Sequence, residues 1–127
     1  MAKLEERPVD SGVAGARTLD DAALVEWWRK RFTMVAGVPA ETARAGVLLP
    51  QMRQLARLPD EERRRLTKAR MRAFLSLPGD QRQLILAARR HADAVDPDLA
   101  KSDDAVAQSL VSEVEGAAEF QREMDRK

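Results

Sequence analysis

The chain has 127 residues, of which 44% are hydrophobic, enough for one domain with a single modest core. It contains no cysteine, which excludes disulfides and thiolate metal sites, and no run of about 18 apolar residues that could span a membrane. Residues 1–7 carry acids and no apolar run, which argues against an ordinary signal peptide. We therefore expect a cytoplasmic protein with no membrane partner.

Composition favours helices throughout. Alanine occupies 21 positions, arginine 17 and leucine 14, whereas there is one isoleucine and no tyrosine. Alanine, arginine and leucine are strong helix formers, and β-branched and aromatic residues favour sheets. We expect an all-α fold: a compact bundle of five or six short helices.

The net charge of +1 conceals a segregation along the chain. Residues 44–90 contain twelve basic and four acidic residues, whereas residues 91–127 contain four basic and ten acidic ones. Such blocks either screen each other or meet separate partners. The abundance of arginine and alanine also has a bland explanation, because GC-rich genomes encode both residues often.

The N-terminal part contains Pro8, Gly12 and Gly15 without a periodic apolar pattern. We expect residues 1–17 to form a flexible arm ahead of a single helical domain at residues 18–127. Thr18 is a good N-cap for the first helix, which Gly37 ends. Four apolar residues follow at helical spacing on one face: Leu24, Trp28, Phe32 and Val35.

Four prolines then recur at intervals of 19 or 20 residues: Pro39, Pro59, Pro78 and Pro97. Proline fits the first position of a helix, where its missing N–H would have no partner. The spacing therefore predicts a series of single helices. Within the segment that starts at Pro39, we expect Pro50 to break or kink the helix, and Met52, Leu55 and Leu58 to continue in a second short one.

The next two helices have clearer apolar faces. The helix from Pro59 is predicted to bury Leu66, Ala69, Ala73 and Leu77, with Phe74 beside them. The helix from Pro78 is predicted to bury Leu84, Ile85, Ala88, Ala92 and Val95. His91, the single histidine, falls on the same side and is expected to be a packed core residue.

Aspartates crowd the region after this helix. Asp96, Pro97 and Asp98 mark a start of about one turn, and Ser102 is expected to cap a last helix with Val106, Leu110, Val114 and Ala117 along one side. The carboxylates of Asp93, Asp96, Asp98, Asp103 and Asp104 lack the spacing of a calcium loop. We interpret them as caps and surface charge, and expect neither a metal nor a cofactor.

The phrase from Leu75 to Arg82, which leads into Ile85 and Leu86, resembles the opening of region 4 in bacterial sigma factors. There, a Leu-Pro-x-x-Gln-Arg phrase begins the helix ahead of a helix-turn-helix, so the resemblance implies a DNA-binding unit. The sequence departs from that pattern further on, because no glycine marks the turn and residues 101–115 are mainly acidic or small. The phrase is therefore interpreted as a helix start.

The clearest candidate surface is a basic stripe on the helix from Pro59, made of Arg64, Arg65, Lys68 and Arg72. Lys68 and Arg72 have no acid three or four residues away, so nothing within the helix pairs with them. The stripe could dock phosphate or acidic side chains, together with Arg82, Arg89 and Arg90 of the following helix. The alternatives are a solvated face, or a face covered by the protein's own acidic tail from Ser102 onward. If that tail regulates access, deleting residues 102–127 should raise affinity for an anionic partner.

Two apolar residues complete the candidate partner-binding set. Leu86 is expected to be exposed, and Trp27 lies about 100° from the core face and next to Arg31, where it is either a partner anchor or a second core contact. No catalytic motif is present, so we expect a non-catalytic protein-interaction or regulatory module with an acidic protein partner. The alternative is a nucleic-acid-binding protein that uses Arg64, Lys68 and Arg72. Self-association is left open.

Overall fold

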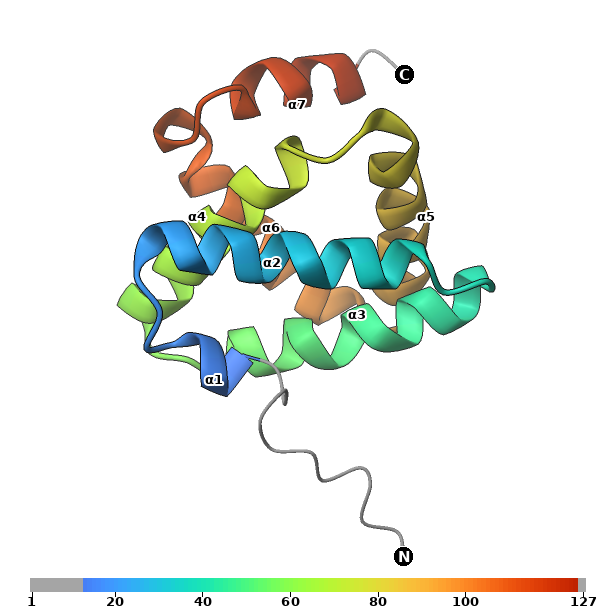
Figure 1. Ribbon diagram of the computed structural model, residues 1–127, viewed down its shortest axis with the longest axis horizontal. Helices are drawn as coiled ribbons and strands as arrows, with labels where there is room; N and C mark the ends of the chain where they lie inside the picture. The colour runs from blue at the N-terminus through green and yellow to red at the C-terminus, as the bar shows by residue number, and fades with distance from the viewer. Residues whose placement is uncertain (1–12, 126–127) are drawn as a thin grey trace, which may run out of the picture.

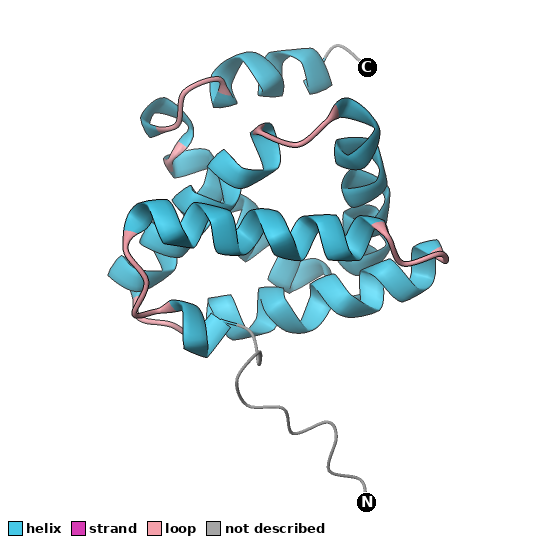
Figure 2. Cartoon of the chain, in the orientation of Figure 1, coloured by secondary structure: helices cyan, strands magenta, loops and turns pink. Residues whose placement is uncertain are grey.

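The computed structural model describes residues 13–125, in which short loops join helices and no strand occurs (Figure 1, Figure 2). The elements of this range are α1 (Val13–Ala16), α2 (Asp21–Ala36), α3 (Glu41–Ala56), α4 (Asp60–Leu75), α5 (Gly79–Val95), α6 (Pro97–Ser109), the 3₁₀ helix η3 (Val111–Glu113) and α7 (Ala117–Asp125). The predicted all-α bundle is confirmed.

Two helix pairs build the core. α2 packs along α4, and α3 packs along α5, while α6 lies against α3, α4 and α5. The face predicted for the first helix is buried at all four positions, with Trp28 only 1% exposed. On α4, Leu66, Ala69 and Ala73 are buried, as is Leu77 just beyond its end, so that face is also confirmed.

Each of the four prolines stands close to a helix start, but only Pro97 lies at the predicted first position, and Pro39 precedes Ala40, the N-cap of α3. Pro59 and Pro78 occupy the N-cap, one residue before the first helical residue. Their carbonyl oxygens accept the first helical hydrogen bonds, from the N–H of Arg63 at 2.8 Å and of Arg82 at 3.0 Å. Pro97 does stand in the first turn, after Asp96, whose carboxylate accepts from the N–H of Leu99.

The end of the expected N-terminal arm belongs to the folded domain. Val13 and Ala16 of α1 are buried in the core, and the N–H of Val13 donates to Oε1 of Gln54 on α3 at 2.9 Å. The boundary predicted at residue 17 is therefore too late. The rest of the expected arm, residues 1–12, lies outside the described residues.

The break predicted at Pro50 is wrong, because α3 runs continuously through it. A helical proline leaves the carbonyl four residues earlier without its hydrogen bond. That residue is Gly46, and both Gly46 and Pro50 lie on the exposed side of α3. Water can therefore reach the freed carbonyl, and the rest of the helix is held by the buried Leu48, Met52 and Leu55.

The last predicted helix is also wrong in its limits. Ser102 lies inside α6, which starts at Pro97 and continues for 13 residues. The chain leaves the helix at Leu110, forms η3, and turns at Gly116, whose φ of 86° is a left-handed conformation that glycine tolerates best. α7 then starts as a separate helix, at the top of Figure 1.

On α5, the predicted core face is confirmed at Ile85, Ala88 and Ala92 but not at its C-terminal end. Val95 is 66% exposed, and Leu84 is half-buried. His91 is not a core residue, because it is exposed and its Nε2 contacts the carboxylate of Glu41 at the start of α3. None of the helices described has both the length and the apolar character to cross a membrane.

Candidate functional site

The basic stripe forms one wall of a polar pocket. Arg64, Arg65, Lys68 and Arg72 project from α4 into a space of about 250 Å³ that also borders α2 and the end of α6. Three carboxylates share this polar pocket: Asp21, Glu61 and Glu113. The structure thus brings together all four residues of the predicted stripe, and places acids from three different elements among them.

Glu113 of η3 forms ion pairs with two residues of the stripe, Lys68 and Arg64. Its Oε1 lies 2.7 Å from Nζ of Lys68, and its Oε2 lies 3.6 Å from a guanidinium nitrogen of Arg64. Arg64 also donates to Oγ of Ser109 at 2.8 Å. The hydrogen bond and charge of Lys68, followed by the charges of Arg64 and Arg72, lower the pKa of the Glu113 carboxyl.

The two remaining stripe residues differ in how they are bound. Nε of Arg65 donates to Oδ1 of Asp21 at 3.0 Å, and its guanidinium also donates to the carbonyl of Leu19, so Arg65 joins α4 to the start of α2. Arg72 is exposed and makes no hydrogen bond or ion pair to any residue within 13–125. Arg72 is therefore the cation of the stripe that is available to another molecule.

The other predicted site residues do not line the polar pocket. Arg82 donates to the carbonyl of Leu77, in the loop between α4 and α5, at 2.5 Å. Leu86 is half-buried rather than exposed. Trp27 is half-buried against the core, with its ring edge-on to Trp28 at 4.9 Å and the Arg31 guanidinium 4.5 Å from its centroid. A role for Trp27 as a partner anchor stays a prediction.

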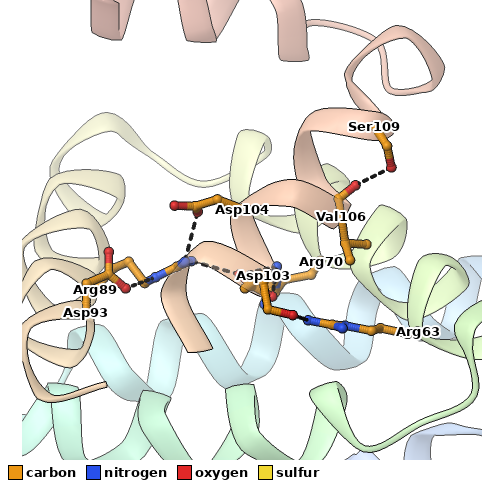
Figure 3. A network of polar contacts seen from close by, with 9 residues as sticks. Arg63, Arg70, Arg89, Asp93, Asp103, Asp104, Val106 and Ser109 are labelled. Atoms are coloured by element: carbon orange, nitrogen blue, oxygen red, sulfur yellow. Dashed lines mark hydrogen bonds and ion pairs between the residues drawn. The ribbon is translucent and has the colours of Figure 1, made fainter. Parts of the chain in front are cut away.

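Arg89 belongs to a separate ionic cluster between α4, α5 and α6 (Figure 3). At its centre is Asp103 of α6, whose side chain is 2% exposed. Both of its carboxylate oxygens accept from Arg70 at 2.9 Å, and Oδ2 lies 3.0 Å from Arg89. Arg89 also binds Asp93 at 2.6 Å and Asp104 at 2.9 Å.

Burial and the neighbouring positive charges have opposite effects on the pKa of Asp103. Burial alone would raise the pKa of this carboxyl, but the nearby guanidinium groups of Arg70 and Arg89, with Arg63 behind them, hold the pKa below its ordinary value. Arg63 itself donates to Oγ of Ser102 at 2.9 Å. The aspartate is therefore ionised in the folded protein and ties α6 to both α4 and α5.

Protein-family models, curated proteins and solved structures give no match to this chain.

A cover over the basic region was one of the alternatives that the charge segregation left open, and the structure brings acids of α6 and η3 to basic residues of α4. The charge segregation could not indicate which acids do this. Glu113 lies 45 positions from Lys68, and Asp103 lies 33 positions from Arg70 and 14 from Arg89. Their pairing depends on the turn after α6 and on which face of α6 is buried, and neither follows from local spacing.

The interpretation of the five aspartates as caps and surface charge is wrong for Asp103, which is buried between Arg70 and Arg89. It holds for Asp96, which caps α6 and lies 3.6 Å from Arg53.

Proposed function

We propose that this protein is a non-catalytic interaction module that binds a carboxylate-rich segment of a partner protein at the basic stripe. We further propose that Glu113 occupies the carboxylate position in the absence of the partner. A partner carboxylate would then displace Glu113 from Lys68 and Arg64 and would also reach Arg72.

One observation carries this proposal: the polar pocket already holds a carboxylate, that of Glu113, between Lys68 and Arg64. Ion pairs at an exposed site contribute little net free energy, because both groups are well solvated when apart. Glu113 is exposed and belongs to a three-residue 3₁₀ helix, so exchanging it for another carboxylate disturbs little of the core. Arg72 supports an external ligand, because it makes no hydrogen bond or ion pair to a residue within 13–125, and only its charge acts on Glu113.

Nucleic acid is the alternative occupant, and the pocket supports it less well. A phosphate backbone needs a surface of uniform positive charge, whereas Asp21, Glu61 and Glu113 are interspersed with the stripe. A nucleic-acid duplex would meet all three carboxylates, while a flexible acidic peptide can place single side chains between them.

The test is fluorescence anisotropy of a labelled oligoglutamate peptide, titrated with the protein at low and at physiological ionic strength. We expect Glu113→Gln to tighten binding by about two- to fivefold, the worth of one competing exposed ion pair. Lys68→Gln should weaken it. A labelled DNA duplex of the same length, measured in parallel, reports on the alternative.

Glu115→Gln is the matched control, because it makes the same charge change two positions away, at an exposed residue outside the polar pocket. An equal gain from Glu115→Gln would show that net charge alone matters and that Glu113 is no competitor. Failure of both the unmodified protein and Glu113→Gln to bind the peptide at low ionic strength would reject the proposed function. Tighter binding of the duplex than of the peptide would favour nucleic acid.

A further inference from the structure

A second cavity, of about 290 Å³, lies between α2, α3, α4 and α5 and is bordered on one side by η3 and α7. We call it the apolar cavity; it shares no lining residue with the polar pocket. Its wall includes four aromatic rings in successive contact, Trp28, Phe32, Phe74 and Phe120. Small-molecule sites are concave and mainly apolar, with a few polar groups that orient the ligand.

α7 contributes part of this wall. Its residues Ala117, Phe120 and Met124 recur at helical spacing and border the cavity, so its apolar face is turned toward it. The Phe120 ring meets Phe74 of α4 edge-on at 5.4 Å. The main backbone contact of α7 is with η3, rather than with the helices of the core. α7 therefore borders the cavity as an element that is separate from the two core helix pairs.

Gln51 supplies the polar group. It lies on α3 in the cavity wall, is only 6% exposed, and makes no hydrogen bond to any residue in the described part of the chain. Its amide is accessible from the cavity and is free to bind a molecule that enters. The Gln51 amide can both donate to and accept from a molecule in the cavity.

The charges around the cavity do not favour an anionic occupant, and no carboxylate in the described part of the chain lines its wall to pair with a cation. Arg70 and Arg89 are the charged residues of the wall. Both are already bound to Asp103, and Arg89 also binds Asp93 and Asp104. Three carboxylates thus offset two guanidinium groups, which leaves no net positive charge for an anionic ligand.

We propose that the apolar cavity binds a small, uncharged aromatic molecule whose polar group hydrogen-bonds to Gln51. This site is independent of the proposed interaction at the basic stripe, so either can fail without the other.

The first experiment uses the full chain and the neutral fluorescent probe N-phenyl-1-naphthylamine. We expect saturable binding of one probe per protein. The anionic probe 8-anilinonaphthalene-1-sulfonate has the same ring system with a sulfonate, and should bind at least tenfold more weakly. Equal affinity for the two probes would overturn the neutral character of the site, and no saturable binding of the neutral probe would overturn the site itself.

Methionine-methyl NMR places the probe within the molecule. Met52, Met71 and Met124 line the cavity, whereas Met34 is 56% exposed elsewhere on α2. The neutral probe should shift the first three methyl resonances and leave that of Met34 unchanged. Shifts that spread equally to Met34 would contradict the proposal. Shifts of the three cavity methyls with protein concentration alone would place a second copy of the chain there and would also contradict it.

Two substitutions complete the test. Leu86→Trp fills the cavity from α5 and should abolish binding, whereas Val95→Trp adds the same ring at an exposed position of the same helix and should not. Gln51→Leu removes the unpartnered amide, should fold normally, and should weaken binding of the neutral probe by roughly 3- to 10-fold, the worth of one hydrogen bond. Equal binding by the two folded tryptophan variants would overturn the proposal. Unchanged binding by Gln51→Leu would also overturn it, and this outcome does not depend on whether Leu86→Trp folds.

Discussion

Asp103 shows how a single side chain can join three helices. Its carboxylate binds Arg70 of α4 and Arg89 of α5 from α6, at 2.9 and 3.0 Å. A buried ion pair adds little stability over a well-packed apolar equivalent, but removing one partner leaves the other charges buried and uncompensated. The geometry of this junction therefore matters more for specifying the position of α6 than for overall stability.

We expect Asp103→Ala to lower the free energy of unfolding by about 3 kcal/mol, because two guanidinium groups lose their buried partner. The side chains of Arg70 and Arg89 are 12% and 23% exposed, which places the cost at the lower end of what buried pairs show. Urea denaturation followed by circular dichroism measures the change. Asp104→Ala is the control: its side chain is 70% exposed, so the loss should stay below about 1 kcal/mol.

The same residue gives a pH dependence with a definite sign. The folded-state pKa of Asp103 is below its unfolded value, so its contribution to stability is complete above the unfolded pKa and is lost as the pH falls through the folded one. The stability difference between the unmodified protein and Asp103→Asn should therefore shrink from about pH 4 downward. A difference that stayed constant to lower pH would contradict the ionised, arginine-bound state.

At the scale of elements, local signals located most helix starts to within one or two residues, and Gly37 ends α2 as predicted. The first N-cap is Asp20 rather than the predicted Thr18. A proline followed by acids in the first turn, as in α4, favours a helix start strongly, because the proline lacks an N–H and the acids interact favourably with the helix dipole.

Pro50 and Ser102 carry equally strong local signals, and tertiary packing overrides both. Leu48 and Leu55 hold α3 on either side of Pro50, and Asp96 caps α6 before Ser102 is reached.

The candidate site was predictable in part for the same reason. The basic stripe follows from periodicity within one helix, so Arg64, Lys68 and Arg72 could be assigned to one face from the sequence. Glu113 could not, because its position depends on the chain leaving α6 at Leu110 and forming η3. Gln51 could not either, since an apolar cavity exists only where several helices meet.

Two glycines on different elements should respond oppositely to alanine. Gly116 has φ 86°, so Gly116→Ala strains the turn before α7 and should cost about 1 kcal/mol. Gly46 lies in the exposed middle of α3, where an added Cβ meets nothing within 4 Å, and Gly46→Ala should stabilise the protein by about 0.5–1 kcal/mol. Thermal denaturation of the two variants measures the sign of each stability change. A stabilising effect of Gly116→Ala would show that the turn is not constrained.

At the scale of the molecule, the C-terminal segment serves two purposes that the sequence did not separate. α6 is a structural helix, because Ala100 and Asp103 are buried and it contacts α3, α4 and α5. η3 follows it and presents Glu113, an exposed residue, to the basic stripe. α6 is therefore part of the folded core, and the exposed carboxylate that follows it in η3 contacts the basic stripe.

Deleting residues 102–127 should consequently abolish cooperative unfolding instead of exposing the stripe. The deletion removes the buried Asp103, Leu110 and Val114, leaves Arg70 and Arg89 without their central carboxylate, and takes away the wall that α7 gives the apolar cavity. Glu113→Gln, in contrast, should melt like the unmodified protein, because it changes one exposed ion pair. Thermal denaturation followed by circular dichroism distinguishes the truncated chain from the Glu113→Gln variant. A truncated chain that melted cooperatively and bound the oligoglutamate peptide more tightly would show that the whole segment is a removable cover, and that the folded core ends before it.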